Sequence, residues 1–410
     1  MTATPVQAAG ITVNSNADTV TNDSFCTLRE AIINANNDAA THPDCPAGFG
    51  ADTITFADNY TITLIGEQLP TVTSPITVNG NGTTSTRIQA NATPNTATYR
   101  VLEVGVSGNL TLDGLSIRHG RCVGACATAG YHGGGILNYG TLTVTNSWLS
   151  TNIADNYGGG IYNSGTLIVT NSMFVNGNYA YNGGGIYNSG GTVTVTGSTF
   201  WLNSATFGGG ILNGDGTLTV TNSTFSENSA SSQGGGILNE IYGVLTVTNS
   251  TLSDNRAPNA GGIAGIYNIN ILNFSNTIIA NSSGGDCETG SGGIISTNLN
   301  NLVEDGSCGA ALNGDPNLGP LDDSGSTWKY PLLAGSPAID AGDDATCANP
   351  PVDNLDQRGV TRPQGSHCDI GAFEYQEDAS PSVVSIVRAS GSPTSASSVD
   401  FTVTFSEPVT

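Results

Sequence analysis

A short motif, GGGI, recurs through the middle of the chain at nearly constant spacing. Its isoleucines are 25, 25, 25 and 26 residues apart, and each is followed two residues later by asparagine. A repeat of this length is one supersecondary unit that cannot bury its own apolar face, so successive units must stack. The chain is therefore predicted to be a solenoid. The five isoleucines are Ile136, Ile161, Ile186, Ile211 and Ile237.

Each repeat also holds a segment in which apolar and polar residues alternate, such as Leu142-Thr143-Val144. Alternation with period two, rich in β-branched residues, predicts a half-buried strand. The strand ends at asparagine or glycine, residue types that adopt the left-handed backbone of a tight bend. A third short segment follows, as in Phe225-Ser226-Glu227-Asn228. Each repeat is thus predicted to hold three short strands and three turns.

Stacked units of this kind predict an all-β fold, a right-handed parallel β-helix with three short strands in each coil of about 25 residues. The right-handed winding follows from the general handedness of parallel crossovers. Equivalent residues would lie about 4.8 Å apart in ladders, and we expect the turn asparagines to bond from coil to coil. Residues expected to be buried are Leu142, Val169, Val195, Val220 and Val247, whereas Thr143, Thr219 and Thr246 should face solvent.

The segments that flank the repeats differ from them in composition. Residues 1–10 are rich in small residues and look like the end of a secretory leader. Residues 11–100 are interpreted as an N-terminal cap and the first coils, with a short capping helix predicted over Leu28 to Asn36 from its helical spacing. Residues 101–300 hold the main coils. The proline-rich residues 301–378 are interpreted as a C-terminal cap, and residues 379–410 as a linker followed by the start of another domain.

The charge balance excludes two classes of partner. The chain has 33 acidic and 10 basic side chains, a formal net charge of −23. Such a protein repels DNA, RNA and anionic lipid. No run of about 18 apolar residues, the length that spans a membrane, is present. We therefore expect no nucleic-acid partner and no membrane span in this chain.

The cysteines fall as neighbours along the sequence, and four local disulfides are the simplest interpretation. Disulfides imply an oxidising compartment. Zinc is the alternative because His42, His119, His132 and His367 each lie within a few residues of a cysteine, but no C-x-x-C pair with a matching second half occurs. The expected pairs are Cys26 with Cys45, Cys122 with Cys126, Cys287 with Cys308, and Cys347 with Cys368.

Motifs at both ends resemble known families. Cys26-Thr27-Leu28-Arg29-Glu30-Ala31, preceded by Ala17-Asp18, resembles the CSLREA signature that opens many secreted bacterial β-helix proteins, with Thr27 where that signature has serine. The later segments resemble the ending of choice-of-anchor domain proteins. These resemblances imply a secreted or surface-displayed bacterial β-helix and say little about activity. The later segments are Asp315–Leu321, Gly335–Gly342, Asp356–Gly359, Arg362-Pro363 and Asp369–Glu374.

The repeats themselves resemble the passengers of polymorphic outer-membrane proteins, which carry GGA-type and FxxN repeats. Phe200 to Asn203 and Phe225 to Asn228 match FxxN fully, whereas Gly177 stands in place of asparagine after Phe174.

The last segment, from Val383, resembles the first two strands of a bacterial Ig-like domain, broken off in mid-domain. An apolar strand face left without a partner is a template for pairing with another chain. A homo-oligomer or fibre formed through the chain ends is therefore one expectation. The residues of this face are Val399, Phe401, Val403 and Phe405.

Many β-helices cleave polysaccharides, so an enzymatic function is the alternative hypothesis. A lyase needs a cationic group to abstract a proton, but Cys122 to Asn255 holds no Lys or Arg. A retaining hydrolase needs two carboxylates about 5 Å apart. Glu227 and Asp254 occupy the same position in adjacent coils and would be this pair, although solvated turn residues are the simpler interpretation.

Exposed aromatic side chains favour binding over catalysis. By alternation from the inward Leu149, Phe174 and Phe200, the neighbouring Trp148, Val175 and Trp201 should face outward. Aromatic residues on a neutral polar wall suit stacking on sugar rings or docking of a partner, although packing against loops is equally compatible. The candidate binding residues are Trp148, Tyr157, Tyr181, Trp201 and Phe207.

The aspartates of residues 301–378 could bind Ca²⁺ through loop carboxylates, with Asp340, Asp343 and Asp344 as the candidates. No D-x-D-x-D-G loop is present, so solvated turn acids are the simpler interpretation. No other cofactor is expected.

We therefore expect an extracellular or cell-surface, non-catalytic β-solenoid that serves as a structural, adhesive or self-assembling unit. A glycan or a surface protein would be its partner. The alternative is a polysaccharide-binding or polysaccharide-degrading β-helix enzyme.

Overall fold

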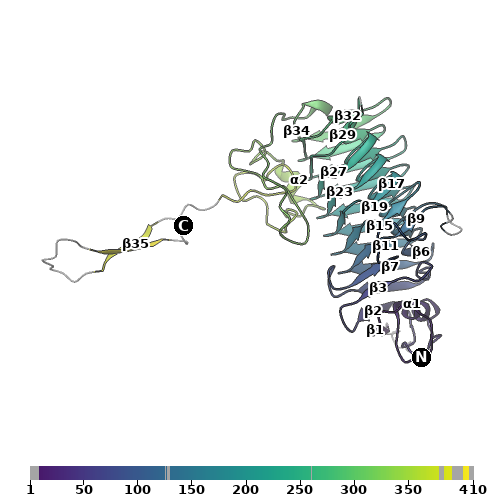
Figure 1. The fold of residues 1–410 in the computed structure, drawn as a ribbon. Coiled ribbons are helices and arrows are strands. Elements are labelled where there is room, and N and C mark those ends of the chain that lie inside the picture. The colour runs from purple at the N-terminus through teal and green to yellow at the C-terminus, as the bar shows by residue number, and fades with distance from the viewer. Residues whose placement is uncertain are drawn as a thin grey trace, which may run out of the picture. The chain divides into compact units, whose positions relative to one another are not determined.

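The computed structural model describes residues 9–124, 126, 130–259, 261–377, 383–389 and 400–405. Two compact units are present, Met1–Tyr375 and Gln376–Thr410. The first is a parallel β-solenoid whose coils advance along one axis from the N-terminus (Figure 1). Central strands of one sheet begin at Thr141, Thr166, Thr192, Thr217 and Val244, so each coil takes 25 to 27 residues.

Four parallel sheets, here named A to D, run along the solenoid. Sheet A consists of β1 (Gly10–Val13), β2 (Asp52–Phe56), β4 (Pro75–Asn79), β7 (Asn109–Asp113), β11 (Thr141–Thr145), β15 (Thr166–Thr170), β19 (Thr192–Thr196), β23 (Thr217–Thr221), β27 (Val244–Thr248), β30 (Ile271–Ser275) and β33 (Ile294–Leu299). Sheet B consists of β3 (Thr61–Thr63), β5 (Arg87–Gln89), β8 (Ser116–Arg118), β12 (Trp148–Ser150), β16 (Met173–Val175), β20 (Thr199–Trp201), β24 (Thr224–Ser226), β28 (Thr251–Ser253), β31 (Ile278–Ala280) and β34 (Leu302–Val303).

Sheet C consists of β6 (Leu102–Val104), β10 (Ile136–Asn138), β14 (Ile161–Asn163), β18 (Ile186–Asn188), β22 (Ile211–Asn213), β26 (Ile237–Asn239), β29 (Ile263–Asn268) and β32 (Gly285–Thr289). Sheet D consists of β9 (Arg121–Cys122), β13 (Ile153–Ala154), β17 (Tyr179–Asn182), β21 (Ser204–Phe207) and β25 (Ser229–Gln233). The predicted three strands per coil are those of sheets A, B and C. Sheet D is a fourth strand that the central coils add before the glycine turn.

The predicted ladders are confirmed. Leu142 pairs with Leu167, and Ile136 with Ile161, in register from coil to coil. The interior side chains are fully buried, and Phe174, Phe200 and Phe225 stack with centroids 4.6 Å apart. Burial of the five predicted interior residues, Leu142, Val169, Val195, Val220 and Val247, is complete, and Thr143, Thr219 and Thr246 are partly exposed.

Two ladders of asparagine amides run inside the wall. In the first, Asn163 Nδ2 donates to Asn188 Oδ1 at 2.8 Å, and the pattern extends from Asn138 to Asn268. The second runs from Asn152 to Asn255 and includes Asn178. The interpretation that Gly177 replaces the FxxN asparagine was therefore wrong, because a one-residue insertion moves that role to Asn178.

A helix covers the first coil. Helix α1 (Leu28–Asn37) begins at Thr27, whose hydroxyl accepts from Glu30 N–H while the Glu30 carboxylate accepts from Thr27 N–H. Arg29, almost buried, forms an ion pair with Asp18 at 2.8 Å. The residues of the CSLREA-like motif and the preceding Asp18 therefore have structural roles in capping the solenoid.

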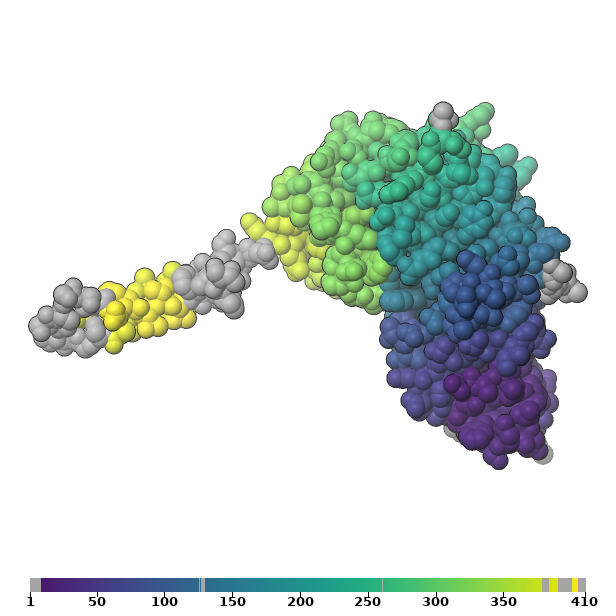
Figure 2. All heavy atoms as spheres, in the orientation of Figure 1, coloured from purple at the N-terminus to yellow at the C-terminus, as the bar shows by residue number. Residues whose placement is uncertain are grey.

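Residues 316–375 lie along the outer face of sheet B, beside the later coils (Figures 1 and 2). Threonines of three successive strands anchor this segment: Thr199 to the backbone of Trp328, Thr224 to Gln357, and Thr251 to the N–H of Ala372. A short helix, α2 (Asp344–Ala348), belongs to this segment. We name residues 316–375 the lateral segment. The residues interpreted as an end cap thus pack mainly on the side of the solenoid.

The buried ion pair of Arg362 and Glu374, 3.0 Å apart, holds the lateral segment together. Arg362 also donates to the carbonyls of Asp369 and Gly371. These residues belong to the choice-of-anchor-like motifs, which therefore build the interior of this segment.

All eight cysteines form the four predicted disulfides. None is available as a thiolate ligand, so the zinc interpretation was wrong. The 3₁₀ turn η1 (Ser307–Gly309) is tied to β32 by the Cys287–Cys308 bond. Disulfides fit an oxidising compartment. Among the described residues, no helix has the length and apolar character needed to cross a bilayer.

The second unit holds an antiparallel hairpin of β35 (Val383–Arg388) and β36 (Phe401–Phe405). The two strands expected from the sequence are thus present and pair with each other, and Phe401 and Val403 on the predicted apolar face keep exposed side chains. Val399 lies outside the described residues. Assembly through the chain ends stays a prediction.

Strand phase in sheet A can be tested at two neighbouring positions. Val220 is fully buried and Thr219 faces outward, so Val220→Asp places an unpaired charge in the stacked core and should cost several kcal/mol of unfolding free energy. Thr219→Asp should be tolerated. Thermal unfolding of the two variants, followed by circular dichroism, measures the difference, and equal destabilisation would mean that the assigned phase is wrong.

Candidate functional site

The corner between sheets B and D has a special backbone in every central coil. One residue after each sheet B strand adopts a left-handed conformation with φ between 52° and 59°. Non-glycine residues adopt this conformation only where the surrounding structure holds it. Because the preceding strands pair in register, these positions are aligned along the solenoid axis. The residues are Thr151, Asn176, Leu202, Glu227, Asp254 and Asn281.

Glu227 and Asp254 follow paired strands, so the predicted neighbourhood of these two carboxylates is present. Glu227 Oε1 accepts a hydrogen bond from Trp201 Nε1 at 3.2 Å, and its other oxygen lies 4.0 Å from the Arg256 guanidinium. Trp201, one of the predicted binding residues, therefore lies beside the predicted carboxylates.

The lateral segment supplies a second set of groups to this corner. Tyr330 hydroxyl lies 2.6 Å from Asp254 Oδ2 and 2.6 Å from Ser226 Oγ. Burial and the Asp254 carboxylate raise the pKa of Tyr330 above its ordinary value, so the phenol donates to Asp254 and accepts from Ser226. Trp328 packs against Trp201 edge to face, with ring centroids 4.6 Å apart, and both indoles are partly exposed.

A cleft of about 620 Å³ opens next to these residues. Arg256 lies in its wall, with 60% of the side chain exposed, and is the only Lys or Arg between residues 122 and 328. We name the corner site this cleft together with Trp201, Glu227, Trp328 and Tyr330. The cleft is lined by Ser229, Asp254, Arg256, Pro258, Asn281 and Ser283.

The other predicted aromatic residues lie elsewhere. Trp148 occupies the first position of β12 and pairs with Met173, whereas Trp201 occupies the last position of β20. Tyr181 and Phe207 contact each other on sheet D, with centroids 5.9 Å apart. Tyr157 packs on Tyr187, 4.5 Å away, within a separate aromatic cluster. The five candidates are therefore spread over three surfaces.

One residue predicted to lie on the outer face of sheet B, Val175, is not exposed to solvent. Val175 alternates with the inward Phe174 as predicted, yet it is only 1% exposed. The expectation that Val175 belongs to an open surface was wrong.

The three candidate calcium ligands are each engaged by other groups of the chain. Asp343 caps α2 through Thr346 N–H, Asp344 pairs with the exposed His367 at 2.7 Å, and Asp340 accepts from His367 N–H. The Asp344 carboxylate raises the pKa of His367. Within the described ranges, no group of three or more His, Cys, Asp or Glu side chains could hold a metal ion.

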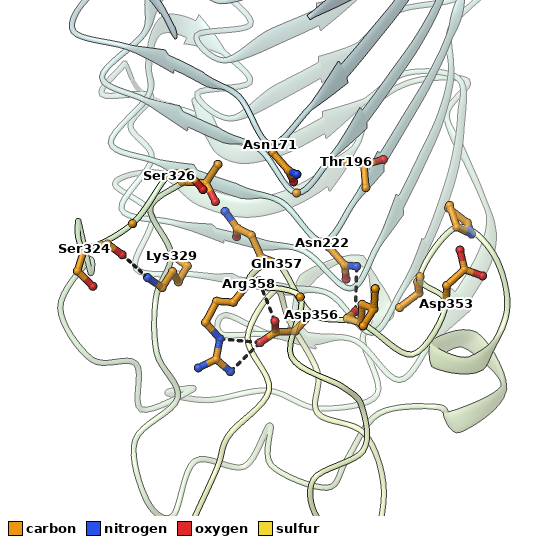
Figure 3. Close-up of a pocket in the computed structure, with 17 residues that line it drawn as sticks. Asn171, Thr196, Asn222, Ser324, Ser326, Lys329, Asp353, Asp356, Gln357 and Arg358 are labelled. Atoms are coloured by element: carbon orange, nitrogen blue, oxygen red, sulfur yellow. Dashed lines mark hydrogen bonds and ion pairs between the residues drawn. The ribbon is translucent and has the colours of Figure 1, made fainter. Parts of the chain in front are cut away.

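A second cleft, of about 540 Å³, lies between the lateral segment and the turns after sheet A (Figure 3). Three of its four charged side chains are already engaged: Lys329 pairs with Asp322 at 2.6 Å, and Arg358 with Asp356 at 2.7 Å. Asn222 donates to the carbonyl of Leu355, and its buried Oδ1 has no partner. The two ion pairs lie within the lateral segment, and Asn222 joins that segment to the solenoid, so these groups serve the packing of the chain. The corner site is therefore the better candidate for a ligand.

Sequence reasoning missed Trp328 and Tyr330. They lie about 130 and 100 residues from Thr199 and Ser226, the residues that they contact. Their one sequence signal is the cluster Trp328-Lys329-Tyr330, two aromatic residues around the only lysine of the chain.

Comparison of the chain with protein-family models, with curated proteins and with solved structures finds no match.

Tyr330→Phe tests the junction between solenoid and lateral segment. The variant removes the donor of Asp254 and leaves the buried Ser226 hydroxyl without an acceptor, which should cost about 1–3 kcal/mol. Tyr242→Phe is the control, because that side chain is 72% exposed. Thermal unfolding should show a lower midpoint for Tyr330→Phe only, and identical midpoints would contradict the assigned contacts.

Proposed function

We propose that the chain is an extracellular, non-catalytic β-solenoid that binds glycans at the corner site. The observation that carries this proposal is the indole pair of Trp201 and Trp328 beside the Glu227 carboxylate, next to a cleft that Asp254 lines. Aromatic faces stack on the apolar face of a sugar ring, and carboxylates accept hydrogen bonds from its hydroxyls.

The charge of the protein narrows the ligand class. At a net charge of −23, the surface repels acidic polysaccharides, so neutral glycans suit the site better. The carboxylates and indoles of the site can bind an uncharged sugar through hydrogen bonds and stacking. The Arg256 guanidinium can donate hydrogen bonds to its hydroxyl or ring oxygens. Neutral sugar polymers are therefore the proposed ligands.

The compartment is part of the same proposal. Four disulfides support an oxidising location, and the terminal motifs resemble secreted or surface-displayed bacterial β-helix proteins. A protein displayed there through a long rigid solenoid would serve as an adhesive or structural unit, holding the corner site away from the surface.

Trp201→Ala tests glycan binding. On an array of neutral glycans, the native protein should bind at least one glycan, and Trp201→Ala should weaken binding at least about tenfold because the stacking surface is lost. Trp148→Ala is the matched control, a tryptophan of the same sheet outside the site. Absence of binding by the native protein, or equal effects of both variants, would overturn the proposal.

A hydrolase is the second candidate function, favoured by the position of Glu227 and Asp254 in adjacent coils. In a hydrolase one carboxyl group must donate a proton to the leaving oxygen. Here both carboxylates accept hydrogen bonds from aromatic N–H or O–H groups, which suits ligand binding better. Release of sugar from a neutral glycan that disappears in Glu227→Gln would favour the enzyme instead.

A further inference from the structure

The polar and aromatic groups of the corner site form a row. Trp201 stands in register with the fully buried Ser226 and Ser253 on strands β20, β24 and β28, and the last of these strands pairs with β31. Glu227, Asp254 and Asn281 each follow one of the last three strands. The site therefore takes one or more residues from each of four successive coils.

The wall of sheet D repeats this arrangement. Ser229 bridges to Arg256, and Arg256 bridges to Ser283, both in parallel register. These three residues line the cleft together with Asp254 and Asn281. The cleft is therefore elongated along the solenoid axis, and equivalent positions carry serine, arginine and serine in three successive coils.

The spacing of the coils sets the length of the site. Equivalent residues of parallel strands lie about 4.8 Å apart. Three such steps separate Trp201 from Asn281, so the row extends over roughly 14 Å. One step is close to the length of one pyranose residue in an extended chain.

On the basis of the proposed glycan binding, we infer that the corner site recognises an extended linear oligosaccharide of three or more residues that lies parallel to the solenoid axis. One sugar ring packs on the Trp201 and Trp328 indoles. The following residues meet Glu227 and Asp254, then Arg256 and Asn281. A monosaccharide or disaccharide reaches only part of this row.

The groups at the far end are available for this role. The Arg256 side chain is 60% exposed and contacts Glu227 only at 4.0 Å. Asn281 uses its amide N–H toward Ser253 Oγ, which leaves its carbonyl oxygen as an acceptor for a sugar hydroxyl.

The experiment measures affinity against chain length. The full chain is titrated calorimetrically with β-1,4-linked glucose oligosaccharides of one to five residues, and with α-1,4-linked ones, which curve away from a straight row. Affinity for the β-linked series should rise at least about tenfold from two to four residues and then level off, whereas the α-linked series should gain little beyond two residues. Equal affinity for the β-linked di- and tetrasaccharide would overturn the inference.

Variants separate the two ends of the site. Arg256→Ala and Asn281→Ala should weaken the tetrasaccharide about tenfold and leave the disaccharide unchanged, while Trp201→Ala weakens both. Asn176→Ala is the matched control, an exposed asparagine with the same left-handed backbone in the same column, outside the cleft. Loss of disaccharide binding in Arg256→Ala would overturn the axial arrangement. Binding of no member of either series would instead remove the proposed function itself, and the inference with it.

Discussion

The structure depends on the in-register stacking of identical side chains on parallel strands. Backbone hydrogen bonds between coils fix the spacing, and each asparagine amide then stands within reach of its equivalent in the next coil. An amide both donates and accepts, so a ladder of amides satisfies itself along its length. This explains how Asn163, Asn188 and Asn203 can be fully buried in the wall without a cost in unpaired polar groups.

The same stacking separates the residues that fold the protein from those that are free to vary. Interior positions and ladder asparagines must match between coils, because a mismatch leaves a gap or an unpaired amide. Positions on the outer face have no such requirement. On sheet B, the outward threonines anchor the lateral segment. A different column, at the corner after these strands, carries Glu227, Asp254 and Asn281. The corner site is therefore assembled from two distant parts of the chain.

The periodicity of the sequence predicted the stacked sheets and their register, and few other features of the structure. The alternation around Leu142 and Val220 identified sheet A and its register, and helical spacing located α1. Sheet D was not predicted, because strands such as Ile153–Ala154 are too short for a period to be recognised in the sequence. The one-residue shift to Asn178 was hidden for the same reason, since only the ladder reveals which asparagine is equivalent. Contacts of Trp328 and Tyr330 could not be predicted, because no repeat links the lateral segment to sheet B.

The terminal motifs illustrate why family-like signatures need not mark a functional site. Arg29 and Arg362 are both buried and paired with carboxylates, and each also donates to backbone carbonyls. Removing one partner of such a pair leaves an uncompensated buried charge, so these residue types are constrained by folding alone. Arg256 differs from both, because 60% of its side chain is exposed and its distance to the Glu227 carboxylate is 4.0 Å. Arg256 shares its column on this wall with Arg121, and the coils between them hold no lysine or arginine. An exposed cation in the wall of a cleft is free to donate to a ligand, which is the role proposed for it.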